Sequence, residues 1–223
     1  MHTPIGHRLR DSRPARVAAC CVAALAVAGD FALVQWADWH DLLQARWAIA
    51  LVALAGAVWS VGGDLPSIGL NLRPVQGWRY WIRATAWIAL AVAVIIGGWL
   101  GARVLGGYET PIYTTQPDEI GGRLLAACVY APLLEETLYR LVLCVPLVAA
   151  CGAWPAIAVS GGVFGALHVV YGNPSPENLC GGWFLAWAYL QSGTISVPLL
   201  LHGLGNLVVV GSQAAAWYWM NAG

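Results

Sequence analysis

A chain of 223 residues in which 59% are hydrophobic and only 10% charged is not an ordinary soluble domain, where about a quarter of residues carry charge. The formal net charge is zero and every base is arginine, so no lysine-rich or arginine-rich tract is available to bind nucleic acid. Alternating strands of the outer-membrane type are not visible, and the 13 tryptophans suit the interfacial belts of a bilayer. The composition predicts an all-α, polytopic transmembrane helical bundle.

The first half of the chain is predicted to hold three accessory transmembrane helices within residues 17–105, after a cytoplasmic N-terminal tail at residues 1–16. The apolar run 17–36 is interrupted only by Asp30 and Gln35, and we interpret it as an uncleaved first span, although a signal peptide has a similar pattern. A loop containing Asp38, His40, Asp41 and Arg46 is expected next. The second span is predicted at about residues 47–61, which is short for a bilayer unless the span begins near Leu42. A turn-rich connection at 62–77 joins it to the third span, predicted at about residues 84–105.

Charge in the loops predicts the orientation of these helices. Arginines are concentrated in the tail and in the second loop, at Arg73, Arg79 and Arg83, whereas acids dominate the first and third loops, the latter with Glu109, Asp118 and Glu119. Because cytoplasmic loops carry an excess of basic residues, we expect a multi-pass protein of the cell membrane with its N-terminus in the cytoplasm.

The second half is predicted to contain apolar spans at residues 124–150, 156–171, 182–191 and 199–211. Residues 214–220 either complete the last span or form a short additional one. The expected total is therefore seven to eight spans.

Three charges interrupt the span at 124–150: Glu135, Glu136 and Arg140. An acidic or basic side chain at mid-bilayer costs roughly 2.5 to 3.5 kcal/mol, so three together indicate a function. Residues four apart share a helix face, which predicts an ion pair between Glu136 and Arg140. Glu135 is turned about 100° away and has no local partner. We therefore expect Glu135 to be the reactive group and the other two to support it.

Two histidines and an amide lie in the later apolar spans. His168 ends the pattern Phe164-x-x-x-His168, and His202 begins the pattern His202-x-x-x-Asn206. A single membrane histidine is often only an interhelical hydrogen bond, and Phe164 by itself is equally compatible with packing. Polar groups buried in lipid must find one another, so we expect Glu135, His168 and His202 to converge to hydrogen-bond or one-water distance.

Such a set of side chains is suited to activating water for amide hydrolysis. A buried glutamate can act as general base, one histidine can orient the water, and the second histidine with Asn206 can donate to an oxyanion. The same residues, Glu135, His168 and His202, could instead hold a divalent metal such as zinc. The absence of an HExxH motif favours the mechanism without a cofactor, but the residues leave both alternatives open.

The three motifs, in this order on successive apolar helices, resemble those of the CPBP family of intramembrane proteases. This is the CAAX-processing and bacteriocin-processing group, also called the Abi family. The resemblance covers about residues 121–212 and implies that Glu135 is the catalytic carboxylate and that His168 helps to activate water. It further implies that His202 and Asn206 stabilise the oxyanion and that Glu136 and Arg140 support the site.

We therefore expect an intramembrane endopeptidase whose partners are the bilayer and a membrane-associated or lipidated protein or peptide. Two alternatives from other classes remain. A non-catalytic membrane scaffold or immunity protein would use the polar cluster only to hold helices together. A proton-coupled transporter would use it as a proton relay, although the two related halves of such transporters are not visible here.

Overall fold

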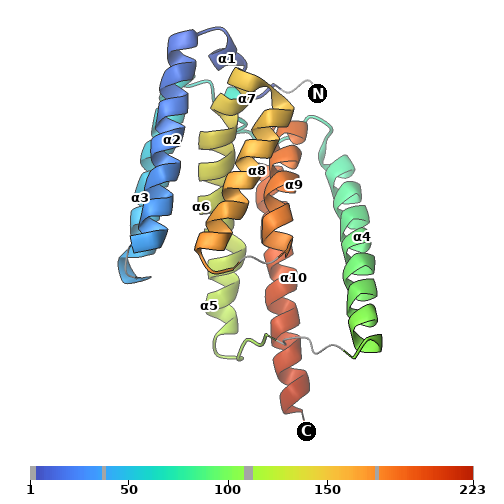
Figure 1. The fold of residues 1–223 in the computed structure, drawn as a ribbon. Helices are drawn as coiled ribbons and strands as arrows, with labels where there is room; N and C mark the ends of the chain where they lie inside the picture. Colours follow the sequence, from blue (N-terminus) through green and yellow to red (C-terminus); the bar gives the residue numbers. More distant parts are fainter. Residues whose placement is uncertain (1–3, 37–38, 108–112, 174–175, 223) are drawn as a thin grey trace. The chain divides into compact units, whose positions relative to one another are not determined.

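The computed structural model describes residues 4–36, 39–107, 113–173 and 176–222, so Asp38 and Glu109 of the predicted loops lie outside the described residues. Within these ranges the regular structure is helical throughout, with no strand. The elements in Figure 1 are α1 (His7–Arg10), α2 (Arg13–Trp36), α3 (Trp39–Ser60), η1 (Leu65–Ile68), α4 (Trp78–Leu105), α5 (Ile120–Leu125), η2 (Ala126–Tyr130), α6 (Ala131–Glu136), η3 (Thr137–Cys144), α7 (Val145–Cys151), α8 (Ala153–Val170), α9 (Pro176–Ser192) and α10 (Ser196–Asn221).

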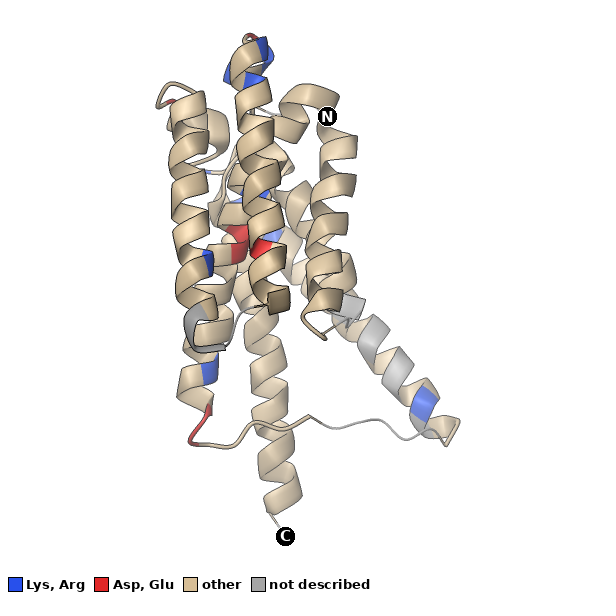
Figure 2. Ribbon diagram, turned by 60° about the vertical axis from the view of Figure 1, so that its left-hand side comes forward, with Lys and Arg blue, Asp and Glu red and all other residues tan. Residues whose placement is uncertain are grey.

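Four of the described helices are long and apolar enough to cross a membrane, at Arg13–Trp36, Leu42–Ser60, Ala153–Val170 and Ser196–Asn221. Figure 2 shows how few charged positions interrupt these helices. The all-helical membrane fold is therefore confirmed, whereas the count of seven to eight spans stays a prediction. All six cysteines are free.

The chain divides into two compact units. The first contains Met1–Val75 and Ala131–His202, and the second contains Gln76–Tyr130 and Gly203–Gly223. Helix α10 continues without a break through both ranges, so residues 214–220 complete the last helix.

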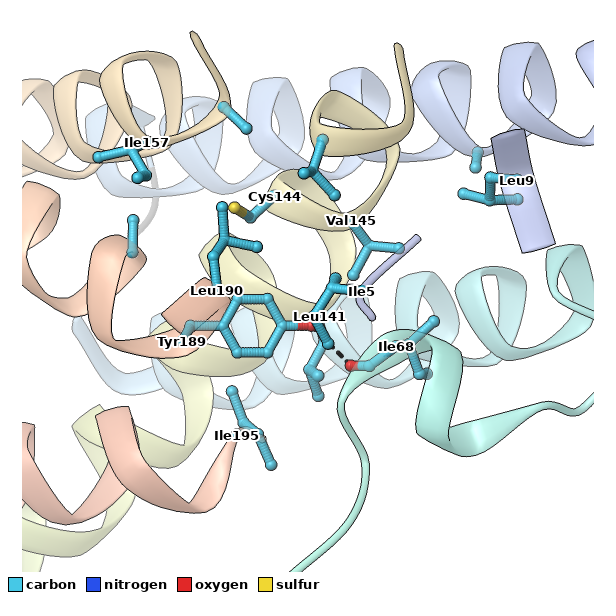
Figure 3. Close-up of a cluster of buried hydrophobic side chains, with 14 of the residues drawn as sticks. Ile5, Leu9, Ile68, Leu141, Cys144, Val145, Ile157, Tyr189, Leu190 and Ile195 are labelled. Carbon is cyan, nitrogen blue, oxygen red and sulfur yellow. Dashed lines mark hydrogen bonds between the residues drawn. The ribbon is translucent and has the colours of Figure 1, made fainter. Parts of the chain in front are cut away.

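One of two apolar clusters in the first unit joins the N-terminal segment to the later helices (Figure 3). Ile5, Leu9 and Ile68 are fully buried against residues of η3, α7 and α9. The Tyr189 hydroxyl satisfies its hydrogen-bonding need by donating to the Ile68 carbonyl at 2.6 Å. The residues predicted as a tail thus include a short helix, α1, that packs on the core, and α2 begins at Arg13.

The second cluster packs α2 and α3 against the segment that carries the three charges. Helix α2 contributes Ala23 and Ala26, and α3 contributes Ala50 and Ala53. Facing them are large side chains of α6, η3 and α8, namely Leu134, Leu138, Tyr139, Val142, Leu143, Phe164 and Leu167. Alanines at helical spacing leave room for the neighbouring backbone, so the two accessory helices lie directly against the charged segment.

The prediction that Arg46 lies in a loop is wrong. Helix α3 begins at Trp39, and Arg46 is 4% exposed within it. Its Nε and Nη2 donate to the two oxygens of Asp30 in α2, at 2.6 and 3.1 Å. The alternative start of the second span near Leu42 agrees with the apolar helix Leu42–Ser60. The partner that makes Arg46 acceptable within this helix lies on another helix, sixteen residues away.

The charged segment changes its helical pitch at the critical residues. Glu135 and Glu136 end the α-helix α6, and η3 continues as a π-helix as far as Cys144. Pro146 follows at the start of α7 and has no N–H for the carbonyl four residues earlier. Widening to a π-helix before a proline relieves the clash with that carbonyl, and such segments are frequent at functional sites.

Candidate functional site

Glu136 and Arg140 form the predicted ion pair, with Arg140 Nε 3.0 Å from Glu136 Oε2. Both side chains are completely buried. The contact is an ion pair without a hydrogen bond, because the Arg140 Nε–H is not aligned with Glu136 Oε2. A buried charge that loses its partner is costly, so each of these residues stabilises the other in the apolar surroundings.

Ser160 of α8 anchors Arg140, a role that sequence reasoning missed. Arg140 Nη1 donates to Ser160 Oγ at 3.1 Å, and Ser160 Oγ donates to the Tyr139 carbonyl at 2.8 Å. The Arg140 guanidinium also lies 5.1 Å from the centre of the Phe164 ring, within cation–π distance. The only sequence signal for Ser160 is a small hydroxyl residue in an otherwise apolar span.

His202 is held by Glu136. Its Nδ1 lies 3.0 Å from Glu136 Oε1. An ionised carboxylate only accepts hydrogen bonds, so Nδ1 carries the proton and donates it. The other nitrogen, Nε2, therefore faces Glu135, whose Oε2 is 3.8 Å away.

Glu135 is 9% exposed, and its Oε2 makes no hydrogen bond to any described residue. Buried polar atoms are nearly always satisfied, and each exception calls for an explanation. A carboxylate oxygen that is buried, unbonded and next to an imidazole is able to accept a proton from a substrate water.

His168 belongs to the same neighbourhood through Phe164. The Phe164 ring lies 4.5 Å from the His168 ring and 5.9 Å from the His202 ring, centre to centre. His168 Nδ1 lies 3.0 Å from the Phe164 carbonyl, which only accepts, so Nδ1 is protonated and Nε2 has a lone pair available in the neutral ring. The convergence of His202 on Glu135 is confirmed, whereas His168 makes no ion pair with Glu135 among the described contacts.

Asn206 lies in the second unit. Its side-chain amide donates to the Ala127 carbonyl at 2.6 Å, within the π-helix η2. Gly203 approaches the same segment, since a Cβ there would lie 2.8 Å from the Cys128 carbonyl oxygen. In the same unit Thr115 donates two hydrogen bonds to Gln213, one from its backbone N–H to the Gln213 carbonyl and one from its hydroxyl to Gln213 Oε1.

Glu135, His168 and His202 are the predicted ligands in the alternative that uses a metal. No group of three His, Cys, Asp or Glu side chains within the described ranges is placed to hold a metal ion. His202 commits Nδ1 to Glu136 and keeps Nε2 available, as metal-ligating histidines also do. The participation of a metal therefore stays a prediction.

Close packing of α8 on α9 fixes the helix that carries Phe164 and His168. A Cβ on Gly161 would lie 2.2 Å from Trp183 Cδ1, and one on Gly182 would lie 2.7 Å from the Gly161 carbonyl oxygen. Gly161 therefore allows the close approach of α8 and α9, whereas Gly162 faces open space.

These observations define an integral membrane protein of apolar helices with a buried cluster of acidic, basic and imidazole groups. Residues 119–208 match the family model described as Type II CAAX prenyl endopeptidase Rce1-like. The matched range is less than half of the chain and includes all the predicted site residues, and the match agrees with the predicted resemblance to the CPBP family. Comparison with curated proteins and with solved structures gave no match.

Proposed function

We propose that the protein is an intramembrane endopeptidase that hydrolyses a peptide bond of a membrane-associated or lipidated protein, with Glu135 as general base. The observation that carries this proposal is the buried Glu135 carboxylate, with one oxygen free of hydrogen bonds and 3.8 Å from His202 Nε2. The match of residues 119–208 to a family of CAAX endopeptidases supports the reaction class.

In the proposed reaction, Glu135 removes a proton from water while the water oxygen attacks the scissile carbonyl carbon. His168 Nε2 orients the water, since its Nδ1 is held by the Phe164 carbonyl. The resulting oxyanion is stabilised by His202 in its doubly protonated form, which donates from Nδ1 to Glu136 and from Nε2 to the oxyanion, and, by the family motif, by Asn206. Glu135 then returns its proton to the leaving amine as the C–N bond breaks.

Glu136 and Arg140 are supporting residues in this scheme. The Glu136 carboxylate fixes the ring orientation of His202, and Arg140 with Ser160 fixes Glu136. Catalytic groups must be held close to their productive geometry, and a misplacement of about 1 Å can cost on the order of a hundredfold in rate. This support gives a role to Glu136, Arg140 and Ser160, three buried polar residues.

We further propose seven spans, with an N-terminus in the cytoplasm. The segments are α2, α3, α4, the continuous run Ile120–Cys151, α8, α9 and α10. Arg8, Arg10 and Arg13 are exposed near the N-terminus, in keeping with the excess of basic residues on the cytoplasmic side.

The decisive experiment compares peptides released in membranes that contain the wild type, Glu135→Gln or Glu119→Gln. Glu119 is a matched control because it is a half-exposed glutamate that pairs on the surface with Arg123 at 3.3 Å. We expect cleavage by the wild type and by Glu119→Gln, and none by Glu135→Gln at equal abundance. Cleavage by Glu135→Gln at the wild-type rate would falsify the proposal.

A chelator arm of the same experiment addresses the metal alternative. Activity should persist after dialysis against EDTA and 1,10-phenanthroline. Loss of activity that added zinc restores would instead require a metal mechanism. Ion flux in proteoliposomes without any proteolysis would favour the transporter. Reduced abundance of Glu135→Gln, with Glu119→Gln at the wild-type level, would favour the scaffold.

A further inference from the structure

Asp30 and Arg46 occupy the small-residue faces of two helices that packing brings together. The buried positions of α2 are Ala19, Ala23, Ala26 and Asp30, spaced four, three and four residues apart. In α3 the buried positions are Leu42, Arg46, Ala50, Ala53 and Ala57, and the last four repeat the spacing of four, three and four residues. The two helices are consecutive and lie side by side (Figure 1), so the end of one face meets the start of the other.

The two charges do not form an isolated pair. The Tyr139 hydroxyl donates to Asp30 Oδ2 at 2.7 Å, so both carboxylate oxygens are used. The Arg46 guanidinium also lies 5.7 Å from the centre of the Tyr171 ring, just beyond the end of α8. The network therefore reaches the charged segment through Tyr139 and the helix of His168 through Tyr171.

Tyr139 connects this network to the candidate site. Its hydroxyl binds Asp30, its carbonyl accepts from Ser160, and its ring packs edge-on at 5.6 Å against Phe164. Glu135 precedes Tyr139 by four residues on the same continuous helical segment, at the end of α6 and within η3, respectively. A displacement of Tyr139 would therefore also displace Glu135, Phe164 and Ser160, the residue that binds Arg140.

A purely structural reason for the Asp30–Arg46 pair is weak. Bringing two charges into an apolar interior has a desolvation cost that their attraction seldom exceeds, and apolar replacements of similar volume are often neutral or stabilising. The rest of both helix faces is already built from alanine and leucine, which pack without charges. An ion pair with fixed geometry is better suited to holding a side chain in one position.

We propose that Asp30 and Arg46 are positioning residues of the candidate active site, which act through Tyr139 on Glu135 and through Tyr171 on the end of α8. This inference rests on the proposed function and adds the accessory helices α2 and α3 to the site. In this proposal α2 and α3 set the geometry of the catalytic side chains and also anchor the protein in the bilayer.

The test is Tyr139→Phe, which removes one hydroxyl and leaves Asp30 paired with Arg46. Tyr189→Phe is the matched control, because Tyr189 is equally buried and also loses one hydrogen bond of a buried hydroxyl, to Ile68. We expect kcat of Tyr139→Phe to fall about tenfold to a hundredfold with KM unchanged within twofold. Tyr189→Phe should keep the wild-type kcat at a comparable loss of thermal stability. Equal kcat values for the two variants would overturn the proposal.

A second variant, Asp30→Asn with Arg46→Gln, removes both charges together and so leaves no unpaired buried charge. We expect this double variant to reach the membrane and to show the same selective loss of kcat as Tyr139→Phe. A folded double variant with wild-type kcat would refute the positioning role.

An activity-independent readout separates this inference from the proposed function. Imidazole ¹⁵N signals of His168 and His202, assigned with histidine-to-glutamine variants, should shift in Tyr139→Phe and stay in place in Tyr189→Phe. If the wild type cleaves no peptide, the proposed function fails, and the histidine signals still decide whether Tyr139 positions the site. Unchanged signals in Tyr139→Phe would end the inference.

Discussion

His202 Nδ1 lies 3.0 Å from Glu136 Oε1, while the other oxygen of the same carboxylate lies 3.0 Å from Arg140 Nε. One buried carboxylate therefore joins the imidazole of α10 to the arginine of η3. Because this contact occupies Nδ1, it determines which nitrogen of His202 faces Glu135. The adjacent glutamates have different tasks, as one orients the imidazole and the other keeps an oxygen free.

The difference between the two glutamates predicts opposite effects of the same substitution. Glu136→Gln leaves Arg140 buried without a counter-charge, and breaking a buried pair in this way costs about 3 to 5 kcal/mol in soluble proteins. Glu135→Gln removes no hydrogen bond from the described structure and should change the stability by less than about 1 kcal/mol. Both variants should lack activity. Thermal unfolding in detergent measures the difference, and equal melting temperatures would contradict the assigned roles.

Adjacent glycines in α8 give a second prediction. In Gly161→Ala the new methyl group would lie 2.2 Å from Trp183 Cδ1 and 2.7 Å from the Trp183 backbone nitrogen, so α9 must move. The overpacking should cost about 1 to 3 kcal/mol and reduce activity, since Phe164 lies one turn away. In Gly162→Ala the methyl group meets nothing within 4 Å, and alanine is the better helix former. Unfolding and cleavage assays on the pair should therefore diverge, and similar behaviour would argue against close α8–α9 packing.

The N-terminal helix gives a pH prediction. Arg8 Nε donates to Asp64 Oδ2 at 2.7 Å, and this hydrogen bond holds the pKa of Asp64 below its ordinary value of 3.8. Because the folded pKa is the lower one, the contact stabilises fully above 3.8 and is lost as the pH falls through the folded value. Hydrogen exchange at the buried Leu9 should therefore accelerate modestly at acid pH, relative to the intrinsic rate. In Asp64→Asn this acceleration should be absent, and its persistence would assign the effect to another group.

The sequence alone determined the properties that depend on local spacing and on the solvent. Its apolar composition predicted membrane helices, because backbone N–H and C=O groups in lipid must be hydrogen-bonded within the protein, and a helix achieves this within a single segment. The Glu136–Arg140 pair followed from a spacing of four residues on one segment. The motifs at Glu135, Phe164 and His202 were sufficient to identify the family that residues 119–208 match.

The tertiary structure alone decided which residues of different helices meet. The pairing of Asp30 with Arg46 requires α2 to lie against α3, and nothing in either segment specifies that contact. Ser160 binds Arg140 because α8 packs on η3, and His202 binds Glu136 across 66 positions of the sequence. Local spacing fixes the face on which a side chain lies, whereas its partner depends on distances between helices, which a single segment does not encode.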